Sequence, residues 1–122
     1  MPGNVVVTGG SKGIGRAVVE KLLQVSEFSG NVFVLSRTPP PTRVLENKRV
    51  RFVRCDFTNI SNVREVSAKL RSQNVQVAVL NAGIGNPLIA PLVTLNVVSQ
   101  TLLAFDLFAS LQRVSFVTSG VA

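Results

Sequence analysis

The sequence predicts an α/β fold in which a doubly wound parallel sheet of about five strands carries helices on both faces. Apolar runs rich in β-branched residues alternate along the chain with segments of helical periodicity, as in strand–helix–strand units. A glycine-rich turn lies between the first apolar run and the first helical segment, where parallel sheets commonly present a ligand site. Right-handed crossovers then give the strand order 3-2-1-4-5. The chain, residues 1–122, is expected to form one domain.

The five predicted strands are short apolar segments bounded by turn residues. They cover residues 4–8, 31–36, 50–54, 75–80 and 114–118. Between the first two strands, a helix is predicted over residues 14–25. The spacing of its apolar residues predicts a buried face that consists of Ile14, Ala17, Val18, Leu22 and Val25.

Two further helical segments are constrained by the residues around them. Three consecutive prolines at positions 39–41 follow the second strand, so the crossover helix there should be short or missing. A helix over residues 61–72 should bury Val63, Val66 and Leu70, which recur at spacings of three and four.

The last predicted helix, over residues 92–111 (Leu92 to Leu111), is apolar on nearly every side. The sheet can cover only one side of this helix, so we expect a second surface to cover the rest. The final strand, residues 114–118 (Val114 to Thr118), should form a sheet edge with unpaired backbone groups. Together the helix and the edge predict a homo-oligomer or a complex with a partner protein.

Charge and composition narrow the class of partner. The net charge is +7, and eight of the basic residues lie between residues 43 and 71. Such a surface suits a phosphate-bearing partner, and a solvated basic face is an equally good interpretation. Nucleic-acid binding is not expected, because the phenylalanines of the strands belong to the predicted core rather than to stacking surfaces. No metal site is expected either.

The chain shows no targeting or membrane segment and a single cysteine. No apolar run precedes residue 4, and prolines and polar residues interrupt the weakly charged stretch between residues 72 and 112, so no membrane span is expected. Cys55 excludes an internal disulfide and is interpreted as a small apolar residue at a strand end. It suits the cytoplasm or another reducing intracellular compartment.

The glycine-rich turn has an informative spacing. Residues 8–15 read Thr-Gly-Gly-Ser-Lys-Gly-Ile-Gly, which is neither the G-x-G-x-x-G of many dehydrogenases nor a P-loop. The spacing resembles the cofactor turn of the short-chain dehydrogenase/reductase family, which implies a Rossmann-like fold. The alternative is a strand–helix turn without a ligand. The resemblance implies a nicotinamide cofactor held here by Gly9, Ser11, Lys12, Gly13, Ile14 and Gly15.

Arg37 directly follows the second predicted strand. In Rossmann folds an acidic residue near this point binds the ribose 2′-hydroxyl, whereas an arginine accommodates a 2′-phosphate. Lys12 in the glycine turn adds a second cation. The two residues predict NADP(H) rather than NAD(H) as the cofactor, although each could also be a solvated surface base.

Two other segments resemble parts of the same cofactor site. Asp56 resembles the family aspartate that accepts a hydrogen bond from the adenine amino group, and it could equally be an acid at a helix N-terminus. Asn81, Ala82 and Gly83 resemble the end of the family's Asn-Asn-Ala-Gly segment, with Leu80 in place of the first asparagine.

The catalytic part of the resemblance is incomplete. Asn96 resembles the helix asparagine that anchors a water, and Ser119 resembles the serine that stabilises a substrate carbonyl. The family's Tyr-x-x-x-Lys pair has no counterpart, because the sequence contains no tyrosine. We therefore expect a truncated or degenerate family member that binds NADP(H) without the full catalytic machinery. The alternatives are a fragment of an active NADPH-dependent carbonyl or alcohol oxidoreductase and a non-catalytic structural subunit of a larger assembly.

Overall fold

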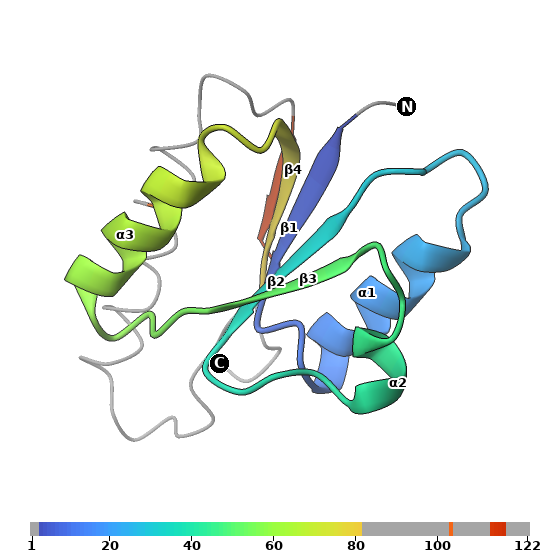
Figure 1. Cartoon of the computed structure of the whole chain (residues 1–122), viewed down its shortest axis with the longest axis horizontal. Coiled ribbons are helices and arrows are strands. Elements are labelled where there is room, and N and C mark those ends of the chain that lie inside the picture. Colours follow the sequence, from blue (N-terminus) through green and yellow to red (C-terminus); the bar gives the residue numbers. More distant parts are fainter. Residues whose placement is uncertain (1–2, 82–102, 104–112, 117–122) are drawn as a thin grey trace.

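The computed structural model describes residues 3–81, residue 103 and residues 113–116 (Figure 1). The elements, in chain order, are β1 (Asn4–Thr8), α1 (Gly13–Gln24), β2 (Val32–Ser36), α2 (Thr42–Leu45), β3 (Val50–Arg54), α3 (Ile60–Leu70), β4 (Val75–Leu80) and β5 (Arg113–Phe116). Figure 1 shows the sheet between two layers, with α3 on one face and α1 and α2 on the other.

The strands form a five-stranded sheet in the order β3-β2-β1-β4-β5, and each neighbouring pair is parallel. The predicted fold class and strand order are therefore confirmed. Strand β2 begins one residue later than predicted, and β5 begins at Arg113 rather than at residue 114. Residues 117–118 of the last predicted strand lie outside the described part of the chain.

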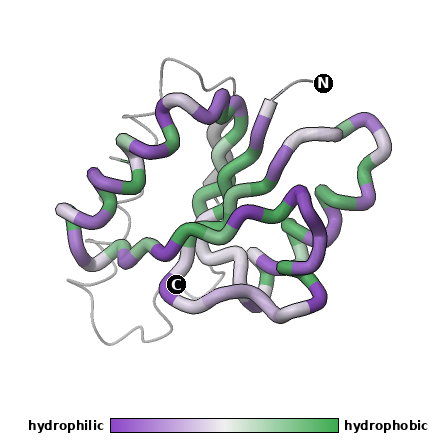
Figure 2. Tube along the Cα trace, viewed as in Figure 1, coloured by the Kyte–Doolittle hydropathy of each residue, from purple (hydrophilic) through white to green (hydrophobic). Residues whose placement is uncertain are grey.

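Strands β1 and β2 are buried on both faces, which is why their sequences read as runs of apolar residues rather than as alternating patterns. The edge strand β3 is different, because its Arg51 and Arg54 are exposed. In β1, Val6 belongs to the core under α3, whereas Val5 and Val7 belong to the core under α1. Figure 2 shows the strands mostly in the colour of hydrophobic residues, while α3 alternates between hydrophobic and hydrophilic ones. Each helix therefore covers its own layer of side chains.

The predicted buried face of α1 is correct for Val18 and Leu22, which are partly buried against the core under α1, and wrong for Ile14, Ala17 and Val25, which are exposed. The buried residues are Gly15 and Val19, whereas Ala17 is exposed and the Ile14 side chain is 61% exposed. The reason is that Gly15 packs against the backbone of the glycine turn and thereby fixes the rotation of the helix. Glycine has no apolar side chain, so Gly15 does not contribute to the spacing of apolar residues from which the buried face was predicted. That spacing therefore predicted a face rotated away from the observed one.

The other two helices follow the prediction. Helix α2 has only four residues after the three prolines. Helix α3 buries Val63, Val66 and Leu70 as predicted, and it begins one residue earlier and ends two residues earlier than predicted. Its N-cap is Asn59, whose side chain accepts a hydrogen bond from the backbone N–H of Asn62 at 3.1 Å.

The predicted helix over residues 92–111 lies outside the described residues except at one position. Leu103 is helical and fully buried, and it joins Val6 and Phe33 in the core under α3. In the described part of the chain, no helix has the length and apolar character needed to cross a membrane.

Candidate functional site

The candidate residues follow strands that end at the same edge of the sheet. The glycine turn follows β1, Arg37 follows β2, Asp56 comes two residues after β3, and Asn81 follows β4. Because these four strands are parallel neighbours, their carboxyl ends meet at one edge. In open α/β sheets this edge is where ligands bind.

The glycines of the turn are required for two different reasons. Gly9 and Gly13 have φ values of 67° and 61°, in the left-handed region that favours glycine. Gly15 is required by space, because a Cβ on it would lie 2.1 Å from the carbonyl oxygen of Gly9 and 2.5 Å from Nδ2 of Asn81. The carbonyl of Gly9 therefore lies so close to the start of α1 that a side chain at position 15 would not fit.

The N-terminus of α1 suits a negative charge. The first N–H groups of a helix have no partner within the helix, and their dipoles place partial positive charge there. Helix α1 has no side-chain hydrogen bond at its N-cap, Lys12, and no acidic residue in its first turn. A phosphate group could accept hydrogen bonds from these N–H groups, as at other helix N-termini.

Asn81 joins the end of β4 to the glycine turn. Its backbone N–H donates to Oγ1 of Thr8 at 2.8 Å, and its side-chain Nδ2 donates to the carbonyl oxygen of Gly9 at 3.3 Å. These two bonds fix the turn to the end of β4, and Nδ2 of Asn81 also lies close to Gly15 at the start of α1. Asn81 is thus placed as a support for the turn, in addition to any contact with a cofactor.

The loop after β2 is fixed on both sides of Arg37. The hydroxyl of Ser36 donates to the carbonyl oxygen of Thr38 at 2.6 Å, and the hydroxyl of Ser11 donates to the same oxygen at 2.5 Å. The two serine hydroxyls also contact each other. On the other side, Nη1 of Arg54 donates to the carbonyl oxygen of Arg37 at 2.8 Å. The loop is therefore tied to the glycine turn and to β3, while Arg37 itself is exposed.

Asp56 is held as a carboxylate. Its Oδ1 accepts hydrogen bonds from Oγ1 of Thr58 at 2.6 Å and from the backbone N–H of Thr58 at 2.9 Å. These bonds lower the pKa of Asp56, and the charge of Arg37 lowers it further. The N-cap of α3 is Asn59, three residues after Asp56, so Asp56 lies before the helix, and both interpretations of it stay predictions.

Cys55, next to Asp56, is fully buried in the core under α3. Burial raises the pKa of its thiol to about 12, and the neighbouring Asp56 charge adds to the rise. The thiol is therefore neutral near pH 7 and is not a nucleophile, in agreement with the interpretation of Cys55 as a small apolar residue.

The structure brings one group of the predicted site residues to the carboxyl edge. This group consists of Gly9, Ser11, Lys12, Gly13, Ile14, Gly15, Arg37, Asp56 and Asn81. The other predicted residues lie outside the described part of the chain; they are Ala82, Gly83, Asn96 and Ser119. Ser36, Thr38 and Arg54 were not among the predicted site residues. Their signal, polar residues at the ends of neighbouring strands, becomes visible only with the strand register.

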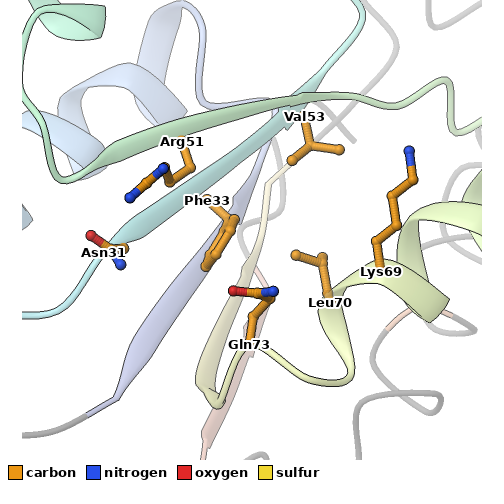
Figure 3. A pocket seen from close by; sticks show the side chains of 7 residues that line it. All are labelled: Asn31, Phe33, Arg51, Val53, Lys69, Leu70 and Gln73. Atoms are coloured by element: carbon orange, nitrogen blue, oxygen red, sulfur yellow. The ribbon is translucent and has the colours of Figure 1, made fainter.

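A cavity of about 320 Å³ lies elsewhere, between strands β2 and β3 and the C-terminal half of α3 (Figure 3). It contains none of the predicted site residues. Its lining consists of Asn31, Phe33, Arg51, Val53, Lys69, Leu70 and Gln73. It is therefore distinct from the candidate site at the carboxyl edge.

Comparison with known proteins identifies the family. The family model described as short chain dehydrogenase matches residues 3–117. Dehydrogenase RED2 from Cochliobolus heterostrophus is 39% identical over 85 residues, which cover 66% of this chain and 30% of that protein.

Solved structures agree with this match. A short chain dehydrogenase family protein from Francisella tularensis has a TM-score of 0.82 and 27% identity, with 100% of this chain and 54% of that chain covered. A short chain dehydrogenase from Leptospira borgpetersenii with bound NAD+ has a TM-score of 0.72 and 26% identity, with 89% and 46% covered. The chain thus spans about a third of the curated relative and about half of the solved structures, and it belongs to the short-chain dehydrogenase family.

Proposed function

We propose that the carboxyl edge of the sheet binds NADP(H) and that these 122 residues form the cofactor-binding part of a short-chain oxidoreductase. The observation that carries the proposal is the contact of Gly15 with the Gly9 carbonyl at the start of α1, a helix without a side-chain cap. This arrangement lets a pyrophosphate approach backbone N–H groups without meeting a side chain. The NAD+ bound by the Leptospira relative supports a nicotinamide dinucleotide as the ligand.

The preference for a 2′-phosphorylated cofactor rests on the loop after β2. Residues 36–38 are Ser-Arg-Thr, so no carboxylate stands where it would accept a hydrogen bond from the ribose 2′-hydroxyl. Arg37 is exposed there, and its backbone is fixed by the hydrogen bonds around it. A guanidinium can bind phosphate oxygens through two parallel hydrogen bonds.

The test compares NADPH and NADH binding by the unaltered chain. The chain contains neither tryptophan nor tyrosine, so the fluorescence of the reduced nicotinamide can be followed without interference from those residues. We expect a lower Kd for NADPH than for NADH. Arg37→Asp should reverse or erase the difference, because a carboxylate repels phosphate and accepts hydrogen bonds from a ribose.

The matched control is Arg64→Asp, which makes the same change of charge at an exposed position of α3. It should leave the ratio of the two Kd values unchanged. Equal Kd values for NADPH and NADH in the unaltered chain would overturn the preference, and no binding of either would overturn the proposal.

Catalysis by these 122 residues alone should be weak. They contain no tyrosine to donate the proton that must neutralise an alkoxide during hydride transfer. The lack of a positioned general acid typically lowers the rate by about 100- to 10,000-fold. We therefore propose cofactor binding without turnover at the rate of a complete enzyme. Reduction of an aldehyde by NADPH at such a rate, abolished by Ser119→Ala, would contradict this.

A further inference from the structure

Arg54 ends β3 and lies beside the loop that carries Arg37. In the sheet register, Arg54 is the partner of Ser36, the last residue of β2. Its Nη1 reaches past that pair and donates to the carbonyl oxygen of Arg37 at 2.8 Å. The guanidinium of Arg54 therefore lies against the residue proposed to bind the 2′-phosphate.

The hydrogen bond to Arg37 uses only part of what Arg54 can donate. A guanidinium has five N–H donors in a fixed fork. One of them binds the Arg37 carbonyl, and within the described residues no carboxylate forms a salt bridge with Arg54. Four donors of an exposed side chain thus remain beyond this bond.

The negative charges expected near Arg37 exceed the single positive charge of its guanidinium. A phosphate monoester carries a charge of about −1.5 to −2 at neutral pH. Asp56 adds a carboxylate close enough for Arg37 to lower its pKa. Arg37 and the predicted cation Lys12 would face both groups, and the Arg54 guanidinium supplies a further positive charge bonded to the loop of Arg37.

We propose that Arg54 is a further specificity-determining cation for the cofactor's 2′-phosphate, beside Arg37 and Lys12. It holds the main chain of Arg37 through one N–H group and offers its other donors to the phosphate. This inference rests on the proposed function, because it requires a 2′-phosphorylated ligand at this edge.

The first experiment measures the Kd of NADPH and NADH for Arg54→Ala. The NADPH Kd should rise about 10-fold or more, as expected for the loss of a charge-assisted hydrogen bond. The NADH Kd should change less than about twofold, which also shows that the variant is folded. The same comparison can be made by calorimetry with two ligands that lack a nicotinamide. Arg54→Ala should raise the Kd of adenosine 2′,5′-bisphosphate and leave the Kd of adenosine 5′-monophosphate nearly unchanged.

The control is Arg51→Ala on the same strand. Arg51 lies on the opposite face of β3, where it lines the cavity beside α3 (Figure 3). Its replacement removes one positive charge from the same strand and should leave both Kd values unchanged. If Arg51→Ala weakened NADPH binding as much as Arg54→Ala does, the effect would come from the net charge of the protein, and the inference would be overturned.

A second variant separates a direct effect of Arg54 from an effect through Arg37. In a chain that already carries Arg37→Ala, Arg54→Ala should still weaken the binding of NADPH relative to that of NADH. No further loss there would mean that Arg54 only positions Arg37, and its direct role toward the phosphate would be refuted. If Arg37→Ala lowers the preference but Arg54→Ala does not, only this inference fails. If the unaltered chain shows no preference, the proposed function fails with it.

Discussion

At the residue scale, Gly13 and Gly15 stand two positions apart, but the fold requires glycine at each for a different reason. A Cβ on Gly13 would meet nothing within 4 Å, so the requirement there is only its positive φ. A Cβ on Gly15 would overlap the Gly9 carbonyl. Substitutions at these two positions therefore measure two different effects, backbone strain at Gly13 and lack of space at Gly15.

Gly13→Ala should lower the free energy of unfolding by about 1–2 kcal/mol, the cost of a left-handed non-glycine residue. Gly15→Ala should lower it by about 1–3 kcal/mol, as overpacking does, and should also abolish NADPH binding because the Gly9 carbonyl must move. Urea unfolding and NADPH titration of both variants provide the measurement. NADPH binding by Gly15→Ala with an unchanged Kd would show that the close approach is not needed.

Cys55 should react slowly with alkylating reagents in the native protein. Near pH 7, a thiol with a pKa of about 12 contains about 1,000-fold less thiolate than one at the ordinary value of 9.0, and burial excludes the reagent as well. Iodoacetamide labelling followed by mass spectrometry should therefore be fast only after unfolding in urea. Rapid labelling of the folded chain would contradict the burial of this residue.

The same thiol makes stability depend on pH. Above about pH 9 the thiol ionises in the unfolded chain but stays protonated in the native one, so the unfolded state binds fewer protons. The free energy of unfolding should then fall as the pH rises through 9 to 10. Cys55→Ala should show less of this decrease than the unaltered chain.

At the element scale, the existence of each described element was predictable from the sequence, but the rotation of α1 was not. The strand limits are marked by apolar runs that end at glycine, asparagine or charged residues. The rotation of α1 is fixed by Gly15, whose backbone packs against Gly9, and a residue without a side chain leaves no mark in an apolar period. Helix α3 was predicted correctly because Val63, Val66 and Leu70 themselves make its contacts.

Leu103 bears on the proposed self-association through residues 92–111. Lysine at an outward-facing leucine of this helix should dissociate such an assembly, but Leu103 is buried in the chain's own core. Leu103→Ala should therefore lower the free energy of unfolding by about 2–5 kcal/mol. Leu102 lies outside the described residues.

The two positions can be compared by thermal unfolding and light scattering. Leu103→Lys should unfold the chain, whereas Leu102→Lys, if Leu102 lies at an interface, should lower the mass in solution without unfolding it. A native chain that stays monomeric at high concentration would contradict the proposed association.

At the scale of the whole molecule, the candidate site depends on strands that meet only in the folded sheet. The glycine turn could be predicted because all its residues are contiguous. The ties among Ser11, Ser36 and Thr38, and between Arg37 and Arg54, could not, since they join residues from three strands' ends. They follow from the register of β2 with β3 and from the placement of the turn beside β2.

The preference for NADP+ over NAD+ should weaken in acid. A phosphate monoester has its second pKa near 6, so the dianion that suits two arginines is lost below that pH. Asp56 stays ionised over this range because its pKa is lowered. The ratio of the two Kd values should fall up to about 10-fold between pH 7 and pH 5, as a tenfold loss of dianion implies. A ratio independent of pH would contradict a charge-based preference.

The central position of β1 has a consequence for how the chain emerges from the ribosome. Strand β1 pairs with β2 on one side and with β4 on the other, and β4 begins only at Val75. At about 5–20 residues per second, the valine-rich edge of β1 waits roughly 3 to 13 seconds for its second neighbour. Ribosome-stalled chains that stop short of β4 should therefore crosslink to a holdase chaperone, whereas chains that expose β4 should not. For those seconds, β1 exposes an unpaired edge that can pair with another chain and so begin aggregation.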